Sequence, residues 1–232
     1  METKQISAWL RILSIASLVY LLTCIPVYLA AKNFVHVVMI WNLFLAALPL
    51  LFAWLVRREV LSGRSGKVHG IKVAVWSLLW LFFFPNAPYL VTDLIHTSRN
   101  TYFIRGASGT VYVQDFSIWL SLAHIAAGVF LGTAIGLFSL YLIHRLLLQW
   151  RGRLFSTAVV GIVCLLSGYA VYLGRFLRLN SWDLLRPGVL FSRILENLSP
   201  FCLWFSLLFA GYLLFLYAIF YGLLSAGERG GR

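Results

Sequence analysis

Charge is scarce in this chain of 232 residues, of which only 11% are charged and 7 are acidic. Soluble domains carry about 25% charged and about 45–50% apolar residues, whereas 61% of this chain is hydrophobic. A water-soluble globule of this length cannot hide so much apolar surface. The composition therefore excludes a soluble enzyme, a disordered chain and a disulfide scaffold, and it predicts a helical integral membrane protein.

Cysteine is also rare, and the motifs that mark common catalytic centres are missing. The three cysteines, Cys24, Cys164 and Cys202, lie in apolar stretches without CxxC spacing, which is typical of small buried side chains rather than of zinc or redox sites. The chain has no HExxH motif and no recognisable serine-nucleophile motif. Any active centre must therefore be sought among polar residues placed inside apolar segments.

The apolar residues form six segments, each long enough to cross a bilayer core of roughly 30 Å, which needs about 20 residues. The predicted spans are 12–31, 34–56, 73–95, 116–143, 154–174 and 201–224. No soluble domain interrupts them. The sequence therefore predicts an all-α fold, a polytopic membrane helix bundle that forms one transmembrane domain over residues 1–232.

The basic residues predict how this bundle is oriented. If both termini are cytoplasmic, the inner segments hold twelve of the 19 Lys and Arg residues, as the positive-inside rule requires. The net charge of +12 is then a topology signal and a source of contacts with lipid headgroups. Nucleic acid is not expected as a partner, because no basic run is interleaved with aromatics on a polar face.

Two prolines are predicted to kink the third span. Pro85 and Pro88 each remove a backbone donor and clash with the preceding turn, and Asn86 is suited to cap the half-helix that follows. At 100° per residue, that half-helix gathers its polar side chains within about 80°, and such a stripe faces a protein interior or a water-filled cavity. The stripe consists of Asn86, Tyr89, Asp93, His96 and Asn100.

Other spans place polar side chains at a similar depth. At 1.5 Å per residue, Asn42, Asn86 and His124 all lie roughly 10–12 Å below the outer surface. His124 also begins a stripe with Gly128, Gly132 and Gly136, whose GxxxG spacing favours close helix packing. The remaining histidines, His36, His69 and His144, stand near span ends and are interpreted as interface residues.

The last outer loop is itself basic. Arg175 and Arg178 lie one turn apart, which fits either snorkelling to lipid phosphates or a clamp for a phosphate or carboxylate, and Asp183 can pair with either arginine. Residues 189–198 predict an amphipathic helix that lies on the membrane surface.

These residues together define an outward-facing polar site. The candidate catalytic residues are Asp93, His96 and His124, and the candidate substrate-binding residues are Asn86, Tyr89, Arg175, Arg178, Asn180 and Asp183. In one chemistry, Asp93, His96 and His124 bind a divalent metal, since D-x-x-H spacing places two ligands on one helix face. In the other, Asp93 orients His96 as a general base while the arginines hold an anionic headgroup. No cofactor is assigned.

Three functions remain open at this point. The site can act on or bind an anionic lipid headgroup or a similar envelope substrate. The broken helix is equally a feature of transporters, so a small transporter or carrier subunit, which can work as an oligomer, is an alternative. In the third reading the protein is a structural or accessory membrane protein, and its polar residues hold a kinked bundle together.

Two stretches carry a family resemblance. The run Phe84-Pro85-Asn86-Ala87-Pro88-Tyr89-Leu90-Val91-Thr92-Asp93-Leu94-Ile95-His96 and the run from Gly174 to Asp183 resemble an uncharacterised family of bacterial multi-pass membrane proteins, a domain of unknown function. The similarity extends from the second to the sixth span. The resemblance implies a bacterial cytoplasmic membrane and implies no activity or catalytic residues.

Overall fold

The fold is described from a computed structural model, which covers residues 3–106, 109–178, 188, 192 and 196–230. Helices account for nearly all of it. The α-helices are α1 (Thr3–Ala31), α2 (Val35–Val60), α3 (Lys67–Phe83), α4 (Asn86–Tyr89), α5 (Phe116–Phe176) and α7 (Pro200–Gly230). A 3-10 helix, η1 (Leu90–Arg99), and two short strands, β1 (Phe103–Gly106) and β2 (Gly109–Tyr112), complete the described elements. The predicted all-α class is therefore confirmed.

Within this described part, five helices are long and apolar enough to cross a membrane. They are 4–31, 35–60, 67–99, 116–176 and 200–227. Large apolar side chains lie exposed along them, among them Leu22, Leu78, Phe130 and Trp204. Exposed apolar surface of this extent is suited to lipid rather than to water, so the helices are consistent with a membrane protein.

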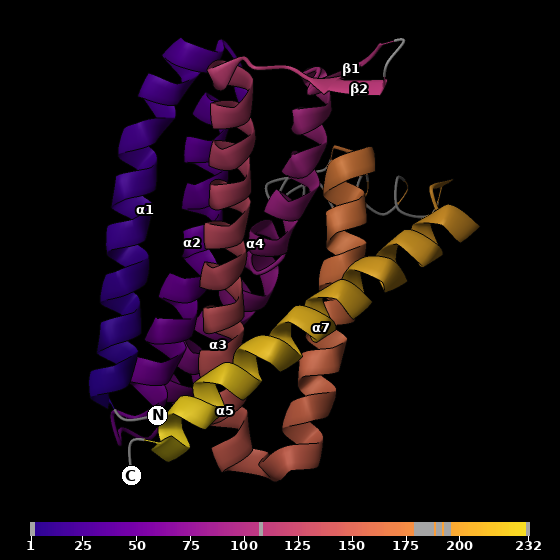
Figure 1. Cartoon of the computed structure of the whole chain (residues 1–232). Helices are drawn as coiled ribbons and strands as arrows, with labels where there is room; N and C mark the ends of the chain where they lie inside the picture. Colours follow the sequence, from indigo (N-terminus) through magenta and orange to yellow (C-terminus); the bar gives the residue numbers. More distant parts are fainter. Residues whose placement is uncertain (1–2, 107–108, 179–187, 189–191, 193–195, 231–232) are drawn as a thin grey trace. The chain divides into compact units, whose positions relative to one another are not determined.

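The count of five differs from the predicted six because α5 takes in both the fourth and the fifth predicted spans. Its 61 residues would measure about 90 Å as one straight helix, roughly three times the thickness of a bilayer core. The helix is interrupted at Gly152, where φ is 80° and ψ is −175°, and the ribbon of α5 reverses direction along its length (Figure 1). That α5 crosses the membrane twice, once on each side of Gly152, therefore stays a prediction.

The predicted kink in the third span takes another form. The α-helix ends at Phe83, before the first proline, and a turn at Phe84-Pro85 leads into the single turn of α4 and then into η1. Asn86 is itself the first residue of α4, and its side-chain amide donates to the Phe83 carbonyl at 2.9 Å. Pro88 cannot donate to the Phe84 carbonyl, which accepts instead from the Ala87 backbone N–H at 3.2 Å. This carbonyl is thus satisfied locally.

The chain divides into two compact units, each described by itself below. Unit 1 comprises Met1–Phe44 and Leu90–Ala134, and unit 2 comprises Leu45–Tyr89 and Ile135–Arg232. The core of unit 1 includes Cys24, Met39 and Ile125, and that of unit 2 includes Phe138, Tyr141 and Cys164. All three cysteines are buried and free, as predicted from their apolar surroundings.

A β-hairpin, which the sequence analysis does not predict, lies between η1 and α5. Phe103 pairs with Tyr112, Ile104 with Val111 and Arg105 with Thr110 in antiparallel register, and every residue of both strands is exposed. The β-branched and aromatic residues on either side of a glycine-containing turn are a hairpin signal. The amphipathic helix predicted at 189–198 falls mostly outside the described residues.

Candidate functional site

The predicted site residues are divided between the two units. Unit 1 contains the candidate catalytic residues Asp93, His96 and His124, and unit 2 contains four of the candidate binding residues. Those four are Asn86, Tyr89, Arg175 and Arg178. The other two candidates, Asn180 and Asp183, lie outside the described residues. Each unit therefore has its own group of polar side chains.

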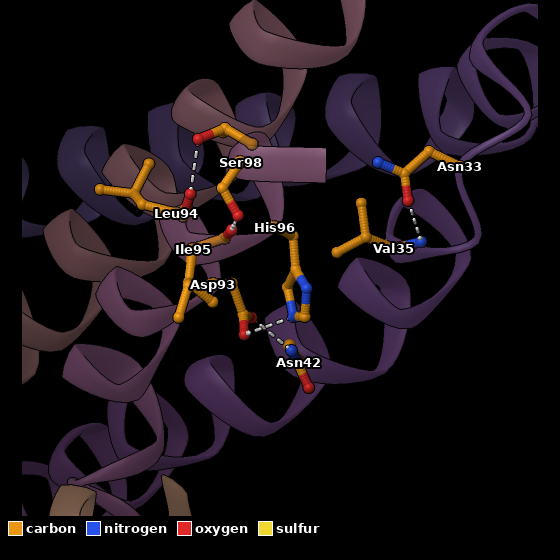
Figure 2. A network of polar contacts seen from close by, with 9 residues as sticks. Asn33, Val35, Asn42, Asp93, Leu94, Ile95, His96 and Ser98 are labelled. Atoms are coloured by element: carbon orange, nitrogen blue, oxygen red, sulfur yellow. Dashed lines mark hydrogen bonds and ion pairs between the residues drawn. The ribbon is translucent and has the colours of Figure 1, made fainter. Parts of the chain in front are cut away.

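Asp93 is the buried charged residue of unit 1, with an exposed fraction of 3%. One carboxylate oxygen, Oδ2, accepts a hydrogen bond of 2.7 Å from the Asn42 side-chain amide of α2. The other oxygen, Oδ1, lies 3.8 Å from Nε2 of His96 (Figure 2). Because a lone carboxylate is very costly in an apolar interior, these polar neighbours explain how Asp93 is tolerated there.

The 3-10 geometry of η1 brings Asp93 and His96 together. A 3-10 helix has three residues per turn, so that side chains at i and i+3 stand one above the other. Leu90, Asp93, His96 and Arg99 therefore share one side of η1. The predicted stripe assumes 100° per residue, which does not hold over residues 90–99, but both geometries place Asp93 and His96 together.

A second polar group in unit 1 is centred on His124 of α5. Its Nδ1 lies 3.1 Å from Nδ1 of His36 on α2, and its Nε2 lies 3.1 Å from the Thr23 hydroxyl on α1. The far nitrogen of His36, Nε2, lies 3.0 Å from the Ser121 hydroxyl. Four side chains from three helices thus form one row, which we call the histidine row: Ser121, His36, His124 and Thr23.

Tyr20 borders this row. Its ring stacks on that of His124 with centroids 4.4 Å apart and an interplanar angle of 22°. The residue is 7% exposed, and its hydroxyl has no hydrogen-bond partner among the described residues. The ring of Tyr20 thus contacts the histidine row, and its hydroxyl is within electrostatic reach of the Asp93 carboxylate.

His36 corrects the sequence reading most clearly. It was interpreted as an interface residue near a span end, but it is fully buried and joined to His124 and Ser121. His144 is likewise buried, and its Nδ1 lies 2.7 Å from the Tyr217 hydroxyl. His69 lies 3.4 Å from Glu59 near the surface of unit 2, in keeping with the original interpretation. Position relative to the span ends was therefore a poor guide to burial.

In unit 2, two of the candidate binding residues meet. The Arg175 guanidinium lies over the Tyr89 ring, 4.9 Å from its centroid. An arginine stacked in this way uses the face of its guanidinium and keeps the N–H groups in the plane, where they match the oxygens of a phosphate or carboxylate. Arg178, three residues on, is exposed and has a positive φ of 54°. Asn86 is engaged with the Phe83 carbonyl instead.

The GxxxG stripe of α5 lies at close approaches in both units. A Cβ atom added at Gly128 would overlap the Tyr20 ring in unit 1, and one added at Gly136 would come within 2.5 Å of Ala87 Cβ in unit 2. The expected packing role is therefore confirmed for Gly128 and Gly136. Gly128 also leaves the space in which the Tyr20 hydroxyl lies.

The metal hypothesis finds no group of ligands. In the part of the chain described here, no three His, Cys, Asp or Glu side chains are grouped so that they could hold a metal ion. His124 and Asp93 each make other contacts, with His36 and Asn42 respectively.

Comparison with protein families places the chain. A family model described as "Protein of unknown function (DUF1361)" matches residues 41–216, well over half of the sequence. The protein belongs to this family. The match includes Asn42, Asp93, His96, His124 and Arg175, whereas Tyr20, Thr23 and His36 precede it. Searches of curated proteins and of solved structures give no match.

Sequence reasoning missed two participants for different reasons. Asn42 was noted for its depth, but nothing in the sequence indicated Asp93 as its partner, 51 residues away. His36 does have a signal in the sequence, because burying a histidine among the apolar residues of a predicted span costs free energy unless the side chain is paired. Applied strictly, that rule would have selected His36 beside His124.

Proposed function

We propose that this protein is a multi-pass membrane protein that binds an anionic lipid headgroup or a similar phosphate- or carboxylate-bearing envelope substrate. In this proposal Asp93 and His96 act as an acid–base pair, and Arg175 with Arg178 supplies the positive charge. The membrane is the bacterial cytoplasmic membrane, with both termini on the cytoplasmic side. Oligomerisation is compatible with the proposal and is not required by it.

The observation that carries the proposal is the arrangement around Asp93. A carboxylate in an apolar bundle is usually functional, because its burial is too costly to be retained without use. The amide of Asn42 holds one oxygen at 2.7 Å, and His96 lies near the other at 3.8 Å. A carboxylate that orients an imidazole makes the imidazole a better proton acceptor. The imidazole can then act as a general base.

The contact between Arg175 and Tyr89 supports an anionic ligand. Stacking on an aromatic ring restrains a long side chain and so reduces the entropy lost when an anion binds. Arg175 lies near the end of α5, where a predicted membrane span meets the headgroup region. A phosphate-bearing lipid presents its charge at that depth.

Lipid binding tests the proposal directly. The purified chain is embedded in nanodiscs that contain either phosphatidylglycerol or only zwitterionic lipid, and retained lipid is measured by native mass spectrometry. We expect wild-type protein to retain phosphatidylglycerol and Arg175→Ala to lose several-fold of this binding. The matched control is Arg151→Ala, because Arg151 also stacks on a ring, that of Trp150, at 4.5 Å.

Two results would count against the proposal. Equal retention of anionic and zwitterionic lipid by the wild type would remove the headgroup ligand. An equal loss of membrane abundance in Asp93→Asn and Arg175→Ala would favour the structural role, since residues that act on a ligand should lose function without a fall in protein level.

A carrier is the second candidate, favoured by the histidine row. Buried ionisable side chains that form a chain of hydrogen bonds are a feature of proton relays in transporters. A carrier would move a substrate across liposomes, whereas a headgroup-binding enzyme would modify a lipid and leave the permeability of the liposome unchanged.

A further inference from the structure

The histidine row has a single arrangement of hydrogen atoms that satisfies all its contacts. Thr23 has one hydroxyl hydrogen, and this hydroxyl donates to the Tyr20 carbonyl at 2.7 Å. Its oxygen can therefore only accept from His124, which places a hydrogen on Nε2 of His124 at 3.1 Å. In the neutral ring, Nδ1 of His124 is then an acceptor.

The same reasoning fixes the tautomer of His36. Its Nδ1 faces the bare Nδ1 of His124 at 3.1 Å, so it must carry the hydrogen that the contact needs. Nε2 of neutral His36 is then bare and accepts from the Ser121 hydroxyl at 3.0 Å. Two neutral histidines, one protonated at Nδ1 and the other at Nε2, thus form a continuous row of donors and acceptors.

We propose that His36 and His124 form an intramembrane proton-binding pair that takes up one proton per chain at Nε2 of His36. This site goes beyond the headgroup proposal, because it uses other residues and another ligand. Both rings are buried, His36 completely and His124 with an exposed fraction of 7%. The proton can also move from His36 to His124 across the contact between their Nδ1 atoms.

The balance of hydrogens limits uptake to one proton. Nε2 of His36 is the only bare ring nitrogen of the pair that does not face the other ring, so it receives the added proton. The Ser121 hydroxyl then turns and accepts, and it can donate to a carbonyl of its own helix, as serines in helices do. A second proton would place hydrogens on both Nδ1 atoms 3.1 Å apart, which the contact does not allow.

The surroundings of the pair can hold a positive charge. When the hydrogen on Nδ1 of His36 passes to Nδ1 of His124, His124 becomes the cation and His36 is left neutral with its hydrogen on Nε2. The cation then stacks on the Tyr20 ring at 4.4 Å, and a cation over an aromatic face is stabilised.

Tyr20 of α1 is a titratable side chain in direct contact with the pair, since its ring stacks on that of His124. Cys24 of α1 and Asp93 of η1 act electrostatically on the Tyr20 hydroxyl.

Solid-state NMR of the chain with ¹⁵N-labelled histidine, embedded in lipid bilayers, tests the pair. At neutral pH we expect one ring with its hydrogen on Nδ1, one with its hydrogen on Nε2, and a coupling between the two Nδ1 atoms through the shared hydrogen. On acidification we expect one additional proton shared by the two rings.

Two variants identify the site. His36→Gln should abolish the coupling between the two rings and the uptake at Nε2 of His36, since the glutamine amide can donate to Nδ1 of His124 but has no ring nitrogen that takes up a proton. Ser121→Ala, a small change with little effect on folding, should shift uptake to lower pH because the added proton loses its acceptor. His144→Gln is the matched control, a buried histidine of unit 2 bonded to Tyr217, and should leave both signals unchanged.

The proposal fails if both rings carry their hydrogen on the same nitrogen, or if the pair takes up two protons or none. It also fails if Ser121→Ala titrates like the wild type. Lipid binding by the same samples is measured separately, so that loss of the headgroup function and loss of proton uptake are distinguishable.

Discussion

At the scale of single residues, Asn42 determines whether the Asp93 carboxylate can stay buried. Its amide donates at 2.7 Å to Oδ2 of Asp93, a carboxylate whose exposed fraction is 3%. Removing one partner of a buried hydrogen bond costs more than removing both, because the remaining group keeps its desolvation penalty. Asn42 is therefore a positioning residue for Asp93.

Asn42→Leu should lower the free energy of unfolding by about 1–3 kcal/mol, the cost of leaving a buried polar group without its partner. The measurement is reversible unfolding of the purified protein in mixed micelles. In the double variant Asn42→Leu/Asp93→Leu the loss should be smaller than in Asn42→Leu alone. If the loss in the double variant equals the sum of the losses in Asn42→Leu and Asp93→Leu, the two residues are not coupled.

The roles of individual residues are predicted from the sequence with uneven success. It selected Asp93, His96 and His124 because polar side chains in apolar spans are conspicuous, and all three have polar neighbours in unit 1. It misjudged His36, since the partner of that ring lies 88 residues away, and no local pattern records such a distance. Tertiary pairing decides the role of a buried histidine.

At the scale of elements, close helix approaches set the packing of α5. A Cβ atom added at Gly168 would overlap the Ser206 carbonyl of α7 and lie 3.0 Å from the Ala210 backbone nitrogen. Backbone atoms cannot move aside as a flexible side chain can. This glycine therefore permits the two helices of unit 2 to touch.

Gly168→Ala should destabilise the protein by about 1–3 kcal/mol, as expected for overpacking at a rigid contact. Thermal unfolding of the purified protein measures the effect. Gly161→Ala is the control, because Gly161 lies on the same helix with nothing within 4 Å of the added atom. Alanine favours helix over glycine, so the control should be neutral or slightly stabilising, and equal losses at both positions would contradict the packing explanation.

The elements also show which sequence rules transfer. Apolar length predicted the positions of the long apolar helices, although the single helix α5 covers two of the predicted spans. The rule of 100° per residue fails from Leu90 onward, because the backbone adopts a 3-10 helix over residues 90–99. The hairpin at 103–112 escaped notice because its strands are short and wholly exposed.

At the scale of the whole molecule, orientation in the membrane is the property that the charge distribution predicts. Reporter fusions at Lys67 and Gly106 should report opposite sides, with Lys67 cytoplasmic. The expectation follows from the excess of Lys and Arg in the segments assigned to the inside. Fusions at both ends of the chain, expected on the side of Lys67, provide the control, and equal signals at Lys67 and Gly106 would refute the predicted arrangement.

A crossing on each side of Gly152 is a separate prediction at this scale. Only a glycine readily adopts its backbone angles, φ of 80° and ψ of −175°. Gly152→Val should therefore reduce correctly folded protein several-fold, as judged by the fraction that is monodisperse after extraction. Gly222→Val, at an open position of α7, should retain most of the yield.

The single hydroxyl hydrogen of Thr23 has an electrical consequence. Because it is committed to the Tyr20 carbonyl, the bond dipoles of Ser121, His36 and His124 all point the same way along the row and add instead of cancelling. Thr23→Val would remove this constraint, and both polarities of the row would then become accessible to unit 1. One small side chain of α1 thus sets the sign of a dipole that runs through three helices.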